Sequence, residues 1–193
     1  MPIHRFLLST AAAIALAVSL PALAQQPMSS QRNAAMPQQQ LSKPDTEFMK
    51  NAAIGGLAEV ELGKLAQRNG HAQQVKDFGS RMVQDHGQAG DQLKSIAQQK
   101  GVQLPDQLDA QHKATRDRLA KLQGDAFDRA YMRAMTTDHD KDVKEFRKEA
   151  QAAKDPDLKR FARDTLNVIE QHDQLAHNVD RQPTSTGSSR APR

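Results

Sequence analysis

The chain has 193 residues, a formal net charge of +4, no cysteine and no tryptophan, and its aromatic residues make up 4% of the sequence. The absence of cysteine excludes a disulfide framework, a thiolate metal ligand and a cysteine nucleophile. With so few aromatic side chains to stack on bases, the small positive charge indicates weak attraction to anionic surfaces, and we expect no nucleic-acid partner.

The first 24 residues have the pattern of a secretory signal peptide. Arg5 precedes an apolar run from Phe6 to Leu20, and Pro21-Ala22-Leu23-Ala24 offers a small-x-small cleavage site. The apolar run is shorter than the roughly 20 residues that a membrane-spanning helix needs, and no later segment is more suitable. We therefore expect cleavage after Ala24, export to a periplasm, and no integral membrane insertion of the mature chain.

Two segments lack any repeating apolar pattern. Residues 25–44 are rich in Gln, Pro, Ser and Met, which predicts a disordered linker, and residues 181–193 predict a disordered tail. Between them, residues 45–180 are enough for one domain with one core.

Apolar residues at three- and four-residue spacing predict five helices, at 45–69, 72–100, 106–122, 125–153 and 156–180. Asp45, Asp125 and Asp155 are the expected N-caps, and Pro156 suits the first turn of the last helix. The four longer helices each have one apolar stripe, as a helix bundle requires. Gly55, Gly56 and Gly63 predict a close approach of the first helix to a neighbour.

An internal repeat suggests how these helices are connected. The sequence Met82-x-x-Asp85-His86 recurs as Met135-x-x-Asp138-His139, with further matches at the same offset on both sides. This predicts two helical hairpins related by a pseudo-twofold axis, with a connection long enough to travel the length of the bundle. We therefore predict an all-α, ferritin-like four-helix bundle, with an additional short helix in the crossover between the second and third long helices.

One polar residue interrupts the apolar stripe near the middle of each long helix: Glu59, His86, His139 and His172. Central positions meet at the same height whether neighbouring helices run parallel or antiparallel. Because an unpartnered buried polar group costs about 1–3 kcal/mol, the four must satisfy one another, water or a cation. We predict that they bind one divalent transition-metal ion, Zn, Fe, Cu, Mn or Ni, and the lack of thiolate sulfur disfavours Cu(I).

A di-iron centre fits the sequence less well than a single ion. Met82 and Met135 stand where the Glu-x-x-His motifs of di-iron bundles have glutamates. A ferritin-like oxidase is correspondingly disfavoured, and we predict no catalytic residue.

Asp85 and Asp138 precede two of the predicted ligands and lie one helical step around from them. We expect them to accept the remaining ring N–H of a histidine across a helix interface, which would fix its tautomer. The alternative is that both aspartates lie on a solvated helix face. The other titratable residues near these positions or near helix ends are expected at the surface: Glu61, Glu170, His71, His112 and His177.

These residues resemble a bacterial family known as domain of unknown function 4142. The resemblance covers about residues 45–180 and rests on Phe48-Met49, Glu59-Val60, the two Asp-His motifs, Phe127-Asp128-x-x-Tyr131-Met132 and His172. It implies an exported protein with a ferritin-like four-helix bundle. Asn167 departs from the family pattern, in which a proline is usual at this position. The resemblance implies no established reaction.

Two functions remain open from the sequence. The first is a periplasmic metal-binding bundle that serves metal handling or envelope stress protection. The second is a structural or interaction protein of the cell envelope, without metal, in which buried histidines and aspartates form a pH-sensitive polar network. A partner could be an envelope protein or a second copy of the chain.

Overall fold

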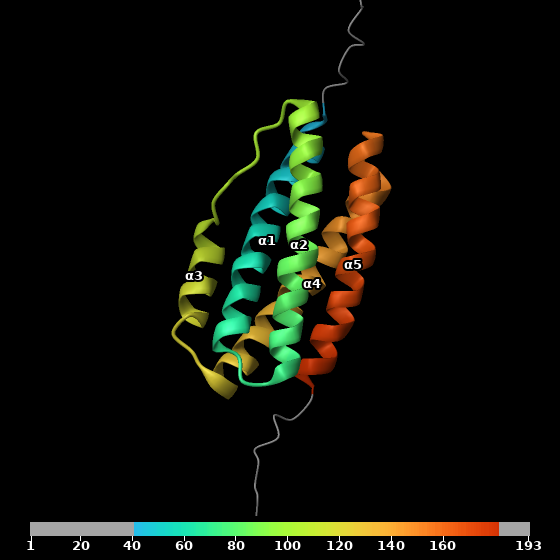
Figure 1. Ribbon diagram of the computed structural model, residues 1–193. Coiled ribbons are helices and arrows are strands. Elements are labelled where there is room, and N and C mark those ends of the chain that lie inside the picture. Colours follow the sequence, from blue (N-terminus) through green and yellow to red (C-terminus); the bar gives the residue numbers. More distant parts are fainter. Residues whose placement is uncertain (1–40, 182–193) are drawn as a thin grey trace, which may run out of the picture. The chain divides into compact units, whose positions relative to one another are not determined.

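The computed structural model describes residues 41–181, which fold into five helices without a strand. The helices are α1 (Lys43–Asn69), α2 (Gln73–Lys100), α3 (Ala110–Leu119), α4 (Gly124–Ala152) and α5 (Pro156–Asp180) (Figure 1). The bounds of α5 are those predicted, whereas α3 is shorter than predicted at both ends. The predicted signal peptide, most of the predicted linker and nearly all of the predicted tail lie outside the described residues.

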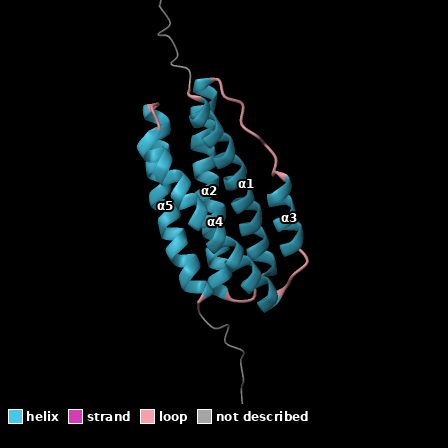
Figure 2. Cartoon of the chain, turned by 180° about the vertical axis from the view of Figure 1, so that it is seen from behind, coloured by secondary structure: helices cyan, strands magenta, loops and turns pink. Residues whose placement is uncertain are grey.

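The four long helices form two antiparallel hairpins, α1–α2 and α4–α5. Helix α1 packs against α2 and α4, and α5 packs against α4 and α2. After α2 the chain returns along the bundle through α3, which lies beside α1, so that α4 runs in the same direction as α2 (Figures 1 and 2). Helices α2 and α4 are therefore diagonal to each other, as are α1 and α5. The predicted bundle with a short helix in its crossover is confirmed.

The capping of α1 differs from the prediction, whereas that of α5 agrees with it. Ser42 is the N-cap of α1, and its Oγ accepts a hydrogen bond from the backbone N–H of Asp45 at 3.2 Å. Pro44 fits inside this first turn because helix N-terminal residues need no backbone N–H. Asp155 caps α5 as predicted and accepts from the backbone N–H of Leu158 at 3.0 Å.

The predicted N-cap of α4, Asp125, also has a different role. Gln123 occupies the cap position of α4, and Asp125 pairs with the side chain of His71 at 2.6 Å. Asp128 of the same turn accepts hydrogen bonds from the backbone N–H groups of His71 and Ala72, at 3.0 and 2.8 Å. This aspartate therefore holds the backbone just before α2, whose cap residue Ala72 has no capping side chain of its own.

Glycines let α1 and α2 approach closely at one point. A Cβ atom on Gly63 would lie 2.6 Å from the carbonyl oxygen of Gly79, and one on Gly79 would lie 2.6 Å from the Cβ of Ala66. The close approach predicted for Gly63 is confirmed. It is wrong for Gly55 and Gly56, since a Cβ on Gly55 meets nothing within 4 Å and one on Gly56 meets only a backbone oxygen at 4.0 Å.

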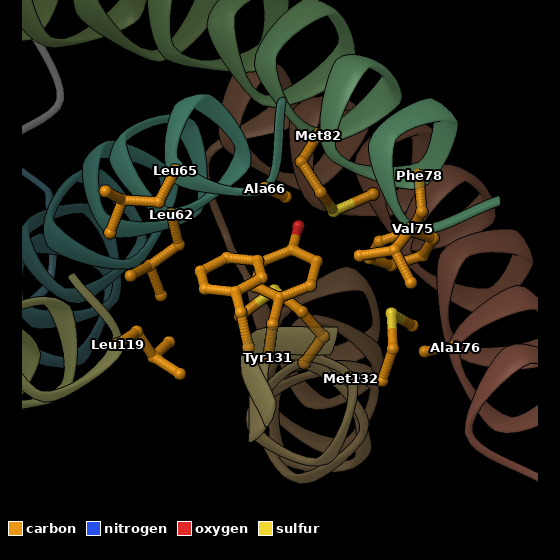
Figure 3. Close-up of a cluster of buried hydrophobic side chains, with 12 residues drawn as sticks. Leu62, Leu65, Ala66, Val75, Phe78, Met82, Leu119, Tyr131, Met132 and Ala176 are labelled. Carbon is orange, nitrogen blue, oxygen red and sulfur yellow. The ribbon is translucent and has the colours of Figure 1, made fainter. Parts of the chain in front are cut away.

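The apolar stripes meet in two clusters at the two ends of the bundle. The Tyr131 cluster, drawn in Figure 3, contains Leu62, Leu65, Ala66, Val75, Phe78, Met82, Leu119, Phe127, Tyr131, Met132, Met135 and Ala176. The Phe146 cluster contains Phe48, Met49, Leu93, Ala97, Phe146, Leu158, Phe161, Ala162 and Ile169. Along each long helix, the polar residue singled out from the sequence lies between members of the two clusters. Among the described helices, none combines the length and apolar character needed to cross a bilayer.

Candidate metal centre

The four predicted ligands come together in a buried polar layer between the two apolar clusters. Glu59 of α1, His86 of α2, His139 of α4 and His172 of α5 are 1, 5, 0 and 1% exposed. The imidazole centroids lie 5.2 to 5.8 Å apart. Phe78 of the Tyr131 cluster packs against this layer, with its ring centroid 6.2 Å from that of His139.

Burial keeps the three imidazoles neutral. It lowers the pKa of His86 and His172 to about 4 and the pKa of His139 to about 3, because an imidazolium cation loses its hydration there. A neutral imidazole has one N–H and one nitrogen lone pair, and the partner of the N–H decides which nitrogen is which.

Two of the imidazoles have a carboxylate partner at their outer nitrogen. His86 Nδ1 lies 2.6 Å from Glu59 Oε2, and His172 Nε2 lies 2.8 Å from Asp85 Oδ2. Since an ionised carboxylate only accepts hydrogen bonds, each of these nitrogens then donates. The other nitrogens, His86 Nε2 and His172 Nδ1, are left as lone pairs that face each other at 3.2 Å.

The third imidazole is oriented by the backbone of its own helix. His139 Nδ1 donates to the carbonyl oxygen of Met135 at 3.0 Å, so that Nε2 is the lone-pair nitrogen. His139 Nε2 lies 3.5 Å from Glu59 Oε1, and neither atom has a hydrogen-bond partner. One nitrogen from each of the three histidines can be chosen so that all lie within 4.8 Å of one another.

With all carboxylates ionised, the centre of the polar layer therefore contains only acceptors. The three histidines each have a nitrogen within 4.8 Å of the other two, and Glu59 Oε1 lies 3.5 Å from His139 Nε2, without a donor among these atoms. Such an arrangement requires a proton or a cation, because facing lone pairs repel in a medium of low dielectric constant.

A proton can satisfy part of this network. Burial and the charge of Asp138 raise the pKa of Glu59 well above its ordinary value. A protonated Glu59 donates to His86 Nδ1, His86 Nε2–H then donates to His172 Nδ1, and His172 donates to Asp85. This series of hydrogen bonds still leaves His139 Nε2 without a partner.

The two predicted outer aspartates have different surroundings. Asp85 accepts from His172, which lies across the α2–α5 interface, as expected of a residue that fixes a tautomer. Asp138 makes no hydrogen bond to a histidine within residues 41–181, and its carboxylate lies within 4.8 Å of those of Glu59 and Asp142. Sequence reasoning did not single out Asp142. Its position four residues after Asp138, on the same helix face, is the signal that could have found it.

The remaining predicted surface residues lie outside the polar layer. Glu61 pairs with Arg116 at 3.2 Å, and Glu170 pairs with Arg147 at 2.6 Å, both as surface ion pairs. The other three histidines pair with aspartates: His71 with Asp125, His177 with Asp140 and Asp173, and His112 with Asp109. The surface position expected for His112 is wrong, since its side chain is 17% exposed and lines a cavity beside Glu59.

The fold and the polar layer together define a helical bundle with a buried histidine cluster. The chain belongs to the family described as Domain of unknown function (DUF4142), which matches residues 30–179. The family expected from the sequence is thus confirmed. A comparison with curated proteins finds no match.

Solved structures with the same fold include a fragment of another domain-of-unknown-function family, DUF305, and several forms of a protein called CopM. A DUF305 fragment from Deinococcus radiodurans is 14% identical, with a TM-score of 0.65 over 72% of this chain and 97% of that one. CopM in the Cu(I)-bound form is 16% identical, with a TM-score of 0.59 over 69% of this chain and 93% of that one. The Cu(II)-bound form of CopM is also 16% identical, with a TM-score of 0.61 over 70% and 95% of the two chains. At these identities the likeness shows the fold alone.

Proposed function

We propose that this chain is an exported protein that binds a transition-metal ion through His86, His139 and His172, with Glu59 holding the outer nitrogen of His86. Its proposed role in the cell is metal handling or protection of the envelope against metal-driven stress. The polar layer has no nucleophile activated by a neighbouring base, so that binding, without a reaction, is the proposed activity.

One observation supports this proposal above the others. Each histidine has one nitrogen on a separate partner, Glu59, Asp85 or the carbonyl of Met135, and the three imidazoles have nitrogens within 4.8 Å of one another. Metal-ligating histidines are held in this way, with one nitrogen on the ion and the other donating to a carboxylate or a carbonyl. A structural histidine in a core needs no such convergence.

The spacing of the inner atoms supports the same proposal. The 3.2 Å between His86 Nε2 and His172 Nδ1 is at the upper end of the hydrogen-bond range. Two ligands of a tetrahedral ion with bonds of about 2.0–2.1 Å lie about 3.3–3.4 Å apart. Imidazole ligands suit Zn, Cu(II), Ni or Fe. The shared fold with copper-bound CopM makes copper a reasonable first choice.

The test is to express the chain with its full N-terminus, purify it from the periplasm, load it with Cu(II), Zn(II) or Ni(II), desalt it, and count bound metal by elemental analysis. We expect one tightly held ion in the polar layer and an intact mass that corresponds to cleavage after Ala24. His139→Gln removes a ligand with little change in volume and should weaken binding by about tenfold or more. His71→Gln, which changes an exposed histidine outside the polar layer, is the matched control and should bind like the wild type.

A metal-free function is the second candidate, because protonated Glu59, His86, His172 and Asp85 can form a continuous series of hydrogen bonds without an ion. In that case the chain is an interaction protein of the envelope whose polar layer responds to pH. No retained metal in the wild type, or equal loss in His71→Gln and His139→Gln with circular dichroism unchanged, would favour this candidate over the first.

A further inference from the structure

A cavity of about 150 Å³ adjoins the polar layer on the side of the Phe146 cluster. Its wall is apolar where it meets that cluster. Its polar wall includes Glu59, Asp138 and Asp142, together with Asp109 and His112 at the start of α3. One carboxylate oxygen from each of Glu59, Asp138 and Asp142 can be chosen so that all lie within 4.8 Å of one another. We call these three residues the carboxylate cluster.

The carboxylate cluster has no cation or donor within it. Glu59 is 1% exposed, lines the cavity, and has one oxygen without a hydrogen-bond partner. In the described part of the chain, no side chain donates a hydrogen bond to Asp138 or Asp142. Lys141 and His112 of the cavity wall partly offset the negative charge of Asp138, but their ion pairs are with Glu145, at 3.8 Å, and Asp109, at 2.8 Å. Burial and mutual repulsion raise the pKa of Asp142.

The internal repeat shows that this crowding of acids is specific to one side of the bundle. The offset that matches His86 with His139 also matches Asp85 with Asp138 and Ala89 with Asp142. On the α2–α5 side, Asp85 therefore accepts a hydrogen bond from His172, and the residue one turn later is Ala89. On the α1–α4 side, the aspartate meets the carboxylate of Glu59 and the next turn adds a third acid. Crowded buried acids do not stabilise a helix bundle, so packing does not explain this arrangement.

We propose that Glu59, Asp138 and Asp142 bind a second divalent cation in the cavity, next to the ion of the polar layer. Because all the donors are oxygens, the site prefers a hard cation of the Mn²⁺, Mg²⁺ or Ca²⁺ class. A cavity of this size has room for the ion and several waters, which fill its remaining coordination positions. The proposal rests on the proposed function in one respect, because Glu59 also holds the imidazole of His86, a ligand of the first ion. A carboxylate has about four lone-pair sites, of which His86 uses one.

The experiment uses the purified full chain with one equivalent of Zn²⁺, into which Mn²⁺ is titrated while free Mn²⁺ is counted from its electron paramagnetic resonance signal. We expect one Mn²⁺ bound per chain. The double variant Asp138→Asn/Asp142→Asn should weaken Mn²⁺ binding by about tenfold or more, since it removes two charged ligands. Asp91→Asn removes an exposed carboxylate of α2 outside the cavity, and it should bind Mn²⁺ like the wild type.

Absence of bound Mn²⁺ in the wild type, or equal binding in the double variant, would overturn the proposal. Asp142→Ala serves if the double variant does not fold, because α2 has alanine at the matching position. The same titration without Zn²⁺ separates the two proposals. If the chain binds Mn²⁺ but does not retain Zn²⁺, only the proposed transition-metal site of the polar layer is contradicted. If it retains Zn²⁺ but does not bind Mn²⁺, only the proposed site of the carboxylate cluster is contradicted.

Discussion

Each side of the polar layer contains an Asp-His pair, Asp85-His86 or Asp138-His139, and the two aspartates contact different residues. On the α2–α5 side, Asp85 accepts a hydrogen bond from His172 at 2.8 Å. On the α1–α4 side, the matching Asp138 lies beside Glu59, which is another acceptor. The same aspartate thus orients an imidazole on one side and contributes to an unbalanced group of acids on the other.

This difference shows that the chemistry of a repeated motif is decided by the helix packed against it. Helix α5 presents a histidine and α1 presents a glutamate at the same level. As a result, burial lowers the pKa of His172 to about 4 and raises that of Glu59, although both are almost fully buried. The two sides should therefore respond to pH in opposite directions and to substitution to different extents.

The largest expected effect is the pH dependence of the metal-free protein. The folded-state pKa values of the three histidines are about 3 to 4, below the ordinary value of 6.5. As the pH falls from about 6.5 to 4, the unfolded chain binds protons that the folded chain does not. The stability from neutral histidines is therefore lost over this window, by up to about 3 kcal/mol for each histidine.

For the buried acids of the α1–α4 side, the free energy of unfolding should change with pH in the opposite direction. The pKa values of Glu59 and Asp142 are raised on folding, so the stability that they contribute is present at low pH and is lost as the pH rises through their folded-state values. Urea unfolding from pH 4 to 8 with a chelator measures both effects. A free energy of unfolding that stays constant between pH 6.5 and 4 would contradict the assignment of neutral, buried histidines.

The second effect is on metal affinity. Asp85→Asn replaces a charged acceptor of the His172 N–H with a neutral one and should weaken Zn²⁺ binding in the polar layer by about 10- to 100-fold. Asp138→Asn, the matching change on the other side, should alter that affinity by about threefold at most, because Asp138 holds no histidine. Calorimetric titration of both variants gives the comparison, and equal losses would show that the two aspartates act alike.

The smallest effect is on the stability of the metal-free protein at neutral pH. Asp142→Ala removes one of three crowded acids and should raise the free energy of unfolding by about 1 kcal/mol. The mirror change, Ala89→Asp, places an acid at the matching position of α2 and should lower it by a similar amount. Thermal unfolding in chelator measures both. A stability loss in Asp142→Ala would mean that its carboxylate has a partner in the fold.

Most of the fold follows from the apolar spacing, and the capping details do not. The stripes of α1, α2, α4 and α5 are long enough that their period alone defines four helices. The start of α1 is an example: Asp45 is only 5% exposed and lies within the helix, while Ser42 caps it. Two capping residues three positions apart look equally suitable to local reasoning.

The candidate site was predictable in its membership but not in its pairing. Stripe position and depth along the helix were enough to bring Glu59, His86, His139 and His172 to one level. Which carboxylate meets which imidazole depends on the rotation of each helix about its axis, which sequence spacing does not define. The bond from His172 to Asp85 and the role of Asp142 therefore emerged only from the structure.

The hydrogen-bonded series from Glu59 to Asp85 connects the polar layer with solvent, which bears on how the layer exchanges protons. The series ends at Asp85, whose side chain is 28% exposed on α2. The acids of the cavity lie on α1 and α4, near the start of α3. We therefore expect a proton that a bound cation displaces from Glu59 to leave along the series to Asp85, away from the acids of the cavity.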